Sequence, residues 1–270
     1  MPYQLIALDI DGTLLNSKKE VAPETLSAVH QAAAMGKTIV FCTGRAVSEL
    51  EEFFPVLPEI RYAVFASGAG IYDIAKRKAF GLRGLSRACA DNVLALAKTK
   101  DVMPQIVLAD RDVIQRSHME TLEHFHMGIY RPLYERAMTL TEDIYAYAAQ
   151  CRDTMLKINL YHADAAERVR TRQQLEDFPM EKVYSEVSSL ECSAKGVDKG
   201  TGLLELCRFL DISPALSLSV GDAENDIPML RAAGLGIAMG NAGEAVKLAA
   251  DRVTADLDHG GCAQAIRFAL

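Results

Sequence analysis

Short apolar runs that alternate with helical spacing constrain the fold of this chain most. Residues 3–8 and 38–42 read as buried strands, and residues 23–35 between them carry apolar side chains at helical spacing. A third run, residues 63–66, follows a segment that we expect to be helical through Phe53. Strands that alternate with helices are typical of an α/β fold with a parallel sheet.

The pattern changes in the middle of the chain and returns near its end. Helical and strand-like stretches mix over residues 84–190, whereas a strand at 217–220 and a helix at 227–233 restore the alternation. We therefore expect a Rossmann-like core with a parallel sheet, built from residues 1–83 and 191–270. Residues 84–190 would form an α/β domain inserted into it.

Polar residues follow three of the expected core strands. Asp9 and Asp11 follow the first, Thr43 the second and Asp222 a later one. If the strands are neighbours, these side chains converge at the carboxyl edge of the sheet, where open α/β folds bind ligands. Carboxylates gathered there repel one another unless a cation neutralises them, and hard oxygen ligands select Mg²⁺. Each motif taken alone is equally compatible with a turn or a helix cap.

Composition limits the class of partner. The net charge of −7 argues against a nucleic-acid-binding protein, which needs a basic face. The six cysteines form no C-x-x-C pair and fit buried, reduced thiols of a cytoplasmic protein. We expect no signal peptide and no membrane span, because the first residues lack a basic region and no long apolar run occurs. The oligomeric state does not follow from the sequence.

Four motifs occur in a fixed order along the chain. They are Asp9-Ile10-Asp11-Gly12-Thr13-Leu14, Thr43-Gly44-Arg45, the lysine of Lys195-Gly196-Val197-Asp198-Lys199-Gly200, and Gly221-Asp222-Ala223-Glu224-Asn225-Asp226. Together they resemble the motifs of the haloacid dehalogenase superfamily, and within it those of the Cof-type sugar-phosphate phosphatases. The resemblance covers nearly the whole chain.

The resemblance implies a role for each acidic residue of the first motif. Asp9 would be the nucleophile that forms an aspartyl-phosphate. Asp11 would protonate the leaving oxygen and then activate water. Mg²⁺ would be held by Asp9, by Asp11 through its carboxylate or backbone, and by Asp222.

The same resemblance implies a phosphate-binding set and a supporting residue. The transferring phosphoryl oxygens would be held by the backbone N–H of Ile10 and by Thr43, Gly44, Lys199 and Asn225. Asp226 would support Lys199 or the waters of the metal.

Two positions depart from the family pattern. Ser67-Gly68-Ala69 stands where relatives usually have Asn-Gly-Ala, so the contact made there is in doubt. Near the C-terminus, His259-Gly260-Gly261 replaces the usual acidic residue before a single glycine.

The place of the insertion separates subfamilies. It lies between the second and third motifs, as in enzymes with a class II cap of subclass B, where the cap would contribute substrate specificity. Asp11 argues for phosphoryl transfer, because related dehalogenases lack this residue. Polar candidates for substrate contacts in the cap are His118, His124, His126, Tyr130, Arg131 and Lys157. Because the histidines lack the H-E-x-x-H spacing, surface or structural histidines are favoured over a zinc site.

These observations favour a Mg²⁺-dependent phosphatase that hydrolyses small phosphorylated metabolites, in particular sugar phosphates. A phosphomutase of the phosphomannomutase type, with the same core and cap subclass, is the alternative. A non-enzymatic protein that binds phosphate compounds is the third hypothesis, and the complete catalytic set argues against it.

Overall fold

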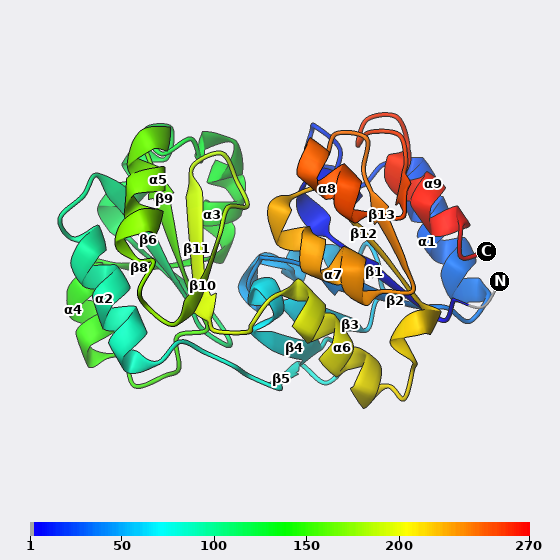
Figure 1. The fold of residues 1–270 in the computed structure, drawn as a ribbon, viewed down its shortest axis with the longest axis horizontal. Helices are drawn as coiled ribbons and strands as arrows, with labels where there is room; N and C mark the ends of the chain where they lie inside the picture. Colours follow the sequence, from blue (N-terminus) through cyan, green and yellow to red (C-terminus); the bar gives the residue numbers. More distant parts are fainter. Residues whose placement is uncertain (1–2) are drawn as a thin grey trace. The chain divides into compact units, whose positions relative to one another are not determined.

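The computed structural model describes residues 3–270 and divides them into two compact units. The core unit contains the chain up to Gly44, Glu52–Gly81 and Asp198–Leu270, and the inserted unit contains Arg45–Glu51 and Leu82–Val197. In Figure 1 the inserted unit is mostly green. The core unit combines blue segments from the start of the chain with orange and red segments from its end.

An eight-stranded sheet organises the core unit, in the order β14-β13-β12-β1-β2-β3-β4-β5. From β14 to β3 all neighbours are parallel, whereas β4 and β5 are antiparallel additions. The strands are β1 (Leu5–Leu8), β2 (Thr38–Cys42), β3 (Tyr62–Phe65), β4 (Gly70–Asp73), β5 (Lys78–Phe80), β12 (Ser217–Gly221), β13 (Leu235–Ala238) and β14 (Arg252–Val253). The helices are α1 (Pro23–Ala34), α6 (Lys199–Phe209), α7 (Ile227–Ala232), α8 (Glu244–Ala249) and α9 (Gly261–Arg267).

Burial on both faces explains why β1 is apolar throughout. All four of its residues are buried, and so is most of β2. Leu5 and Ala7 of β1 pack in one cluster with side chains of α6, since alternate residues of a strand point to the same face. Helix α1 packs against α9, and α6 packs against α7 (Figure 1).

The inserted unit is built on a six-stranded sheet in the order β10-β11-β9-β6-β7-β8. Its neighbours are antiparallel except for β7 and β8. The strands are β6 (Val102–Val107), β7 (Asp112–Gln115), β8 (Met138–Thr141), β9 (Lys157–His162), β10 (Met180–Val183) and β11 (Ser189–Ala194). The helices are α2 (Arg87–Ala97), α3 (Arg131–Ala137), α4 (Ile144–Gln150) and α5 (Ala165–Gln174).

The expected α/β class is confirmed, and one expected helix is wrong. The segment through Phe53 forms two short 3₁₀ turns, Val47–Glu49 and Glu51–Phe53. The side chain of Glu49 accepts a hydrogen bond from the backbone N–H of Ala46 at 2.8 Å, which favours a tight turn at this point. Within residues 3–270, no helix has both the length and the apolar character needed to cross a membrane.

Candidate active site

Asp9 directly follows β1, the strand that lies between β12 and β2. Because these three strands are parallel, Asp9, Thr43 and Asp222 all lie at the carboxyl ends of neighbouring strands. Asp9 is buried, and its backbone N–H donates to the carbonyl of Val220 at 3.0 Å. Carboxylate oxygens of Asp9 and Asp222 lie within 4.8 Å of each other, in a group that also contains Asp226.

Lys199 is the first residue of α6 and is almost completely buried. Its ammonium donates to Asp9 Oδ1 and to Asp226 Oδ1, each at 2.6 Å. Burial alone would lower the pKa of Lys199, but the charges of Asp226 and Asp9 outweigh it and raise this pKa well above its ordinary value. Lys199 is therefore a permanent cation among carboxylates.

Burial first, and neighbouring negative charge second, raise the pKa of Asp9. Burial raises it, Asp226 and Asp222 raise it further, and Lys199 opposes them. The result lies well above the ordinary value of 3.8. A cation placed beside this carboxylate would hold it in the ionised form that a nucleophile requires.

Asp226 connects the lysine to the loop that carries Asp222. Its Oδ1 accepts from Lys199, and its Oδ2 accepts from the backbone N–H groups of Asp222 and Ala223 at 2.9 Å each. The carboxylate is completely buried. Gly221 makes this approach possible, because a Cβ there would lie 2.4 Å from Cγ of Asp226. Asp226 therefore contacts both the ammonium of Lys199 and the backbone of the loop that carries Asp222.

The carboxylate of Asp222 is held from two sides by residues to which the sequence analysis gave no role. Thr13 donates its hydroxyl hydrogen to Asp222 Oδ1 at 2.9 Å, and Asn241 Nδ2 lies 3.4 Å from Asp222 Oδ2. The same Asn241 nitrogen donates to the carbonyl of Gly12 at 2.9 Å. Thr13 belongs to the first motif, whereas Asn241 is 229 residues from Gly12, in the segment Ala238-Met239-Gly240-Asn241-Ala242, which also resembles the family.

Gly12 leaves room for Asp222. Its φ is +81°, and a Cβ at this position would lie 2.2 Å from Asp222 Oδ2. Both the backbone conformation and the close approach therefore require glycine. The chain from Ile10 to Leu14 winds in a wide turn around this point.

Asp11 lies apart from this carboxylate cluster. Its Oδ1 accepts from the ammonium of Lys19 at 3.1 Å, in a partly exposed ion pair. The oxygen atoms that lie within 4.8 Å of one another belong instead to Asp9, Asp222 and Asp226. Of the expected metal set, Asp9 and Asp222 belong to this group of carboxylates, and a contact from the backbone of Asp11 stays a prediction.

The donors present fit a hard divalent cation. Three carboxylates and one ammonium meet in a largely buried place, so one further positive ion would reduce their repulsion. Carboxylate oxygens are the ligands that Mg²⁺ takes in proteins. Asp226 already accepts from Lys199 and from two backbone N–H groups, so Asp9 and Asp222 are the better placed ligands.

The expected phosphate-binding residues lie around the same strand ends. Thr43 is buried after β2, and its carbonyl accepts from the backbone N–H of Ser67 at 3.0 Å. Ser67 is buried and has a left-handed backbone conformation, with φ of 56°. The serine that departs from the family pattern therefore lies in a strained turn beside Thr43. Asn225 is buried, and within residues 3–270 its Oδ1 accepts no hydrogen bond, so a ligand group or water that donates a hydrogen could contact it.

None of the three candidate histidines joins a metal cluster within residues 3–270. His124 Nε2 lies 2.7 Å from a carboxylate oxygen of Asp101, and His126 Nε2 lies 3.1 Å from the carbonyl of Ala163. Burial lowers the pKa of His118. These contacts fit structural histidines.

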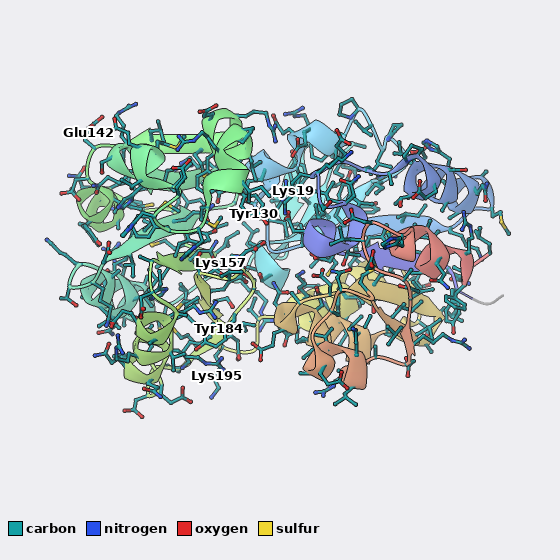
Figure 2. The ribbon with its side chains drawn as sticks, turned by 90° about the horizontal axis from the view of Figure 1, so that it is seen from above. Lys19, Tyr130, Glu142, Lys157, Tyr184 and Lys195 are labelled. Carbon is teal, nitrogen blue, oxygen red and sulfur yellow. The ribbon has the colours of Figure 1, made fainter. Side chains whose placement is uncertain are left out.

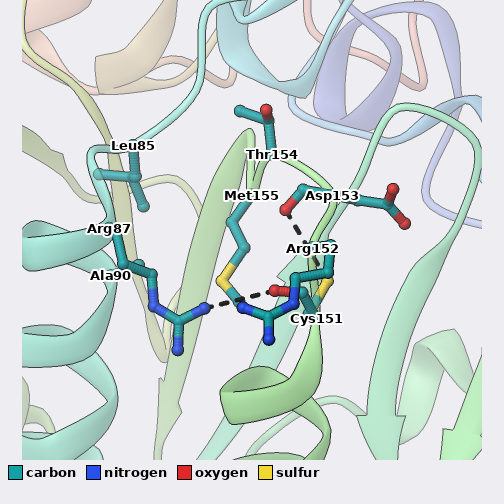
Figure 3. A pocket seen from close by; sticks show the side chains of 8 residues that line it. All are labelled: Leu85, Arg87, Ala90, Cys151, Arg152, Asp153, Thr154 and Met155. Atoms are coloured by element: carbon teal, nitrogen blue, oxygen red, sulfur yellow. Dashed lines mark hydrogen bonds between the residues drawn. The ribbon is translucent and has the colours of Figure 1, made fainter.

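The inserted unit also carries a hollow of about 300 Å³ between the start of α2 and residues 151–155 (Figure 3). Arg87 donates to the carbonyl of Cys151 at 3.3 Å. Both residues line the hollow, and Cys151 is partly exposed. The hollow contains none of the residues of the four motifs.

Comparisons with known proteins show the family of this chain. A sequence model of the haloacid dehalogenase-like hydrolases matches residues 6–266. The phosphatase YwpJ of Bacillus subtilis is 27% identical over 99% of this chain and 100% of its own length. The pyridoxal phosphate phosphatase YbhA of Escherichia coli is 26% identical over 95% of this chain and 94% of its own.

Solved structures give the same result. A haloacid dehalogenase-like hydrolase from B. subtilis superposes with a TM-score of 0.86 at 26% identity, covering 99% of this chain and 100% of that one. A subclass IIB sugar phosphatase superposes with a TM-score of 0.85 over 98% of both chains, and at 23% identity this likeness shows the fold alone. The superfamily expected from the four motifs is confirmed.

Proposed function

We propose that this chain, which belongs to the haloacid dehalogenase-like hydrolase family, is a phosphatase of small phosphorylated metabolites with Asp9 as its nucleophile. The observation that carries the proposal is the position of Asp9. Its carboxylate is buried at the end of β1, contacts Lys199 and lies beside Asp222 and Asp226. This is an anionic nucleophile that contacts one cation and lies among carboxylates that could hold a divalent ion, which would balance the charge of the phosphate.

Attack by an Asp9 oxygen on the phosphorus atom would form a P–O bond and break the bond to the leaving oxygen. Lys199 would neutralise part of the negative charge of the transferring group, together with N–H donors of Ile10 and Gly44, the Thr43 hydroxyl and Asn225. Bound Mg²⁺, held by Asp9 and Asp222 and by Asp11 through its carboxylate or backbone, would reduce the repulsion between the nucleophile and the phosphate.

Asp11 would carry the proton in both steps. It is partly exposed and pairs with Lys19, so a substrate oxygen and a water molecule could both reach its carboxylate. It would protonate the leaving alcohol in the first step. In the second it would take a proton from the water that hydrolyses the aspartyl-phosphate.

Small organic phosphates, sugar phosphates among them, are the substrates that we propose. One relative is named for its action on pyridoxal phosphate. Another, YcsE of B. subtilis, is named for 5-amino-6-(5-phospho-D-ribitylamino)uracil and is 26% identical over 98% of this chain and 94% of its own length. The inserted unit would contribute to specificity as a cap.

Phosphate release from a panel of sugar phosphates and from p-nitrophenyl phosphate, with and without Mg²⁺, tests the proposal. We expect Asp9→Asn to lower kcat by roughly 10³-fold or more, because the nucleophile is lost. Asp211→Asn is the control. It removes an exposed carboxylate of the core unit at a left-handed backbone position that asparagine tolerates, so kcat should stay at the wild-type value. Full activity of Asp9→Asn, or of the enzyme in excess chelator, would refute the proposal. Isomerised sugar phosphate without free phosphate would indicate a mutase instead.

A further inference from the structure

The hollow between the start of α2 and residues 151–155 lies entirely within the inserted unit, and we call it the α2 hollow. Its volume of about 300 Å³ is at the lower limit of the pockets that bind small molecules, which measure about 300–1,000 Å³. None of its residues belongs to the four motifs, so the proposed reaction gives it no role.

Hydrogen bonds fix the two segments that form the α2 hollow. The backbone N–H of Leu85 donates to the carbonyl of Met155 at 2.8 Å and joins the segments directly. The hydroxyl oxygen of Ser86 accepts from the backbone N–H of Cys89 at 3.2 Å, which fixes the first turn of α2. The hollow is therefore formed by backbone whose position is determined on both sides.

The inner wall of the α2 hollow is apolar. Leu85, Ala90 and Met155 line it, and they are 7, 2 and 5% exposed. All three belong to an apolar cluster that also contains Val93 of α2 and Ile158 of β9. The apolar part of a ligand would be removed from water against this wall.

The outer part of the α2 hollow carries two guanidinium groups. Arg87 and Arg152 are both exposed, and in Figure 3 their side chains converge near the carbonyl of Cys151. Arg87 donates to that carbonyl and also to Asp91 Oδ1, the latter at 2.9 Å. Arg152 makes no hydrogen bond or ion pair with any residue of 3–270.

The carboxylate that lines the α2 hollow does not neutralise Arg152. Asp153 Oδ2 accepts from Arg111 Nη2 at 2.6 Å, and in Figure 3 this carboxylate points away from the two arginines of the hollow. Since Arg87 pairs with Asp91, one guanidinium of the hollow, that of Arg152, has no ion-pair partner in the described part of the chain.

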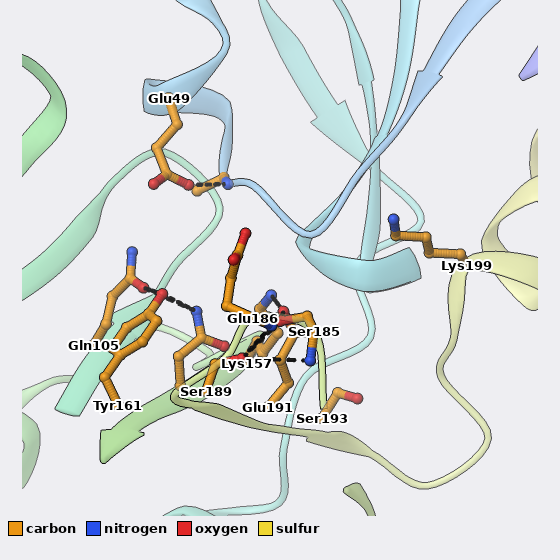
Figure 4. Close-up of polar contacts among 12 residues, drawn as sticks. Glu49, Gln105, Lys157, Tyr161, Ser185, Glu186, Ser189, Glu191, Ser193 and Lys199 are labelled. Atoms are coloured by element: carbon orange, nitrogen blue, oxygen red, sulfur yellow. Dashed lines mark hydrogen bonds and ion pairs between the residues drawn. The ribbon is translucent and has the colours of Figure 1, made fainter. Parts of the chain in front are cut away.

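Two other cations of the inserted unit do have carboxylate partners. Lys157 is buried and donates to Glu191 Oε1 at 2.9 Å (Figure 4). Arg116 is exposed and donates to Glu142 Oε1 at 2.6 Å. Figure 2 labels Lys157 in the interior of the unit and Glu142 at its surface. Arg152 differs from both of these cations, and it lines the α2 hollow.

The groups around the α2 hollow select a ligand with one negative charge. A guanidinium binds a carboxylate through two parallel hydrogen bonds. The Thr154 hydroxyl also lines the hollow, makes no hydrogen bond within residues 3–270, and can donate to the same carboxylate. A phosphate dianion would bring a second negative charge close to Asp91 and Asp153, and no second unpaired guanidinium of the hollow would balance it.

We propose that the α2 hollow binds a small monocarboxylate with an apolar body. The carboxylate contacts Arg152 and Thr154, and the apolar body lies against Leu85 and Met155. The site is separate from the residues of the four motifs, so this inference does not depend on the proposed function.

Cys151 provides a readout at the site itself. It lines the α2 hollow and is partly exposed, whereas Cys42, Cys89, Cys192, Cys207 and Cys262 are buried. A ligand in the hollow should therefore shield this thiol from N-ethylmaleimide, which is a neutral reagent. Benzoate is the probe, and mass spectrometry measures the rate of modification of Cys151 at constant ionic strength.

Saturating benzoate should slow the modification of Cys151 by about fivefold or more, because a ligand that fills the α2 hollow covers the thiol. Benzyl alcohol has a similar apolar body without the charge, so it should need a concentration about tenfold higher or more for the same protection. Acetate has the charge without the apolar body and should also be weaker by about tenfold or more. Inorganic phosphate should give no protection.

Arg152→Gln should raise the benzoate concentration for half-maximal protection by about tenfold or more, because the charged hydrogen-bond donor is lost. Arg170→Gln removes an exposed arginine of α5 in the same unit and is the matched control, for which this concentration should stay at the wild-type value.

Equal protection of wild type and Arg152→Gln, equal protection by benzyl alcohol, or no protection of wild type by benzoate would each overturn the inference. Phosphate that protects as well as benzoate would assign the α2 hollow to a dianion and would also overturn it. The measurement does not use phosphate release, so failure of the proposed hydrolysis would leave its result unchanged.

Discussion

The ammonium nitrogen of Lys199 lies 2.6 Å from a carboxylate oxygen of Asp9, across 190 positions of sequence. Both side chains are nearly inaccessible to solvent, and the same ammonium contacts Asp226 at an equal distance. The proposed nucleophile and the proposed phosphate ligand therefore stabilise each other before any substrate is present. This contact links the end of β1 to the first turn of α6, so the two ends of the chain share one buried charge cluster.

Replacement of this lysine should affect stability as well as activity. Lys199→Met leaves two buried carboxylates without their cation, and breaking a buried ion pair in this way costs about 3–5 kcal/mol. We expect a loss of that order in the free energy of unfolding, measured by urea denaturation in chelator, together with loss of phosphate release. Lys76→Met removes an exposed lysine of the same unit and should leave both quantities near wild type. Wild-type stability of Lys199→Met would contradict the charge cluster described here.

The close approach of Gly12 to Asp222 gives a second prediction, with a control inside the same unit. Gly12→Ala and Gly36→Ala place a Cβ at similar positive φ, +81° and +77°, so both should lose about 1–2 kcal/mol of stability from backbone strain. Only at Gly12 would the Cβ also meet Asp222 Oδ2, at 2.2 Å, whereas nothing lies within 4 Å at Gly36.

We therefore expect Gly12→Ala to lose Mg²⁺-dependent activity and Gly36→Ala to retain it. Urea denaturation and phosphate release measure the two effects separately. Equal activities in the two variants would show that the position of Asp222 does not matter for the reaction.

The strands and the first-motif residues could be predicted because their signals are local. Leu5–Leu8 is apolar because it is buried on both faces, and Asp9 follows it directly, so pattern and position agree. The side chains that hold Asp222 are different. Asn241 reaches the first motif only after β12 and β13 pair, so the segment Ala238-Met239-Gly240-Asn241-Ala242, although it resembles the family, did not reveal this contact.

The same limit applies to the inserted unit. Asn159 faces Gln105 and Glu191 only through strand register, which depends on pairings between segments that are 54 and 32 residues away. Arg45–Glu51 lies next to the second motif in sequence, yet it belongs to the inserted unit. A 3₁₀ turn replaces the expected helix here, because tertiary contacts override a weak local preference for helix.

The two side chains around Asp222 should affect metal affinity more than the chemical step. Thr13→Val removes a hydrogen bond to Asp222 Oδ1, and residues that orient a metal ligand typically contribute about 10–100-fold to affinity. We expect the Mg²⁺ concentration for half-maximal activity to rise by about tenfold, with kcat at saturating Mg²⁺ within a few-fold of wild type. Thr99→Val, at an exposed position in the turn after α2, serves as the control. A lower kcat with unchanged Mg²⁺ dependence would assign Thr13 to another role.

The raised pKa of Asp9 predicts how stability depends on pH without metal. Burial, then Asp226 and Asp222, make the folded chain hold this proton at pH values where the unfolded chain, with a pKa near 3.8, has released it. Folding is therefore increasingly penalised as pH rises from 3.8 through the raised pKa, and the penalty stays constant above it. Asp9→Asn carries no such penalty, so in chelator the Tm of this variant minus that of wild type should grow with pH and then level off.

Saturating Mg²⁺ should shrink this difference in Tm, because the ion stabilises the ionised wild-type carboxylate. Binding at 100 times its Kd contributes about 2.7 kcal/mol of stability. In a chain of this size that corresponds to roughly 5–10 °C in Tm. Thermal unfolding of both proteins across pH, with and without Mg²⁺, measures all four curves. A difference in Tm that is independent of pH in chelator would show that Asp9 titrates normally, and a difference unaffected by Mg²⁺ would show that Asp9 is not a metal ligand.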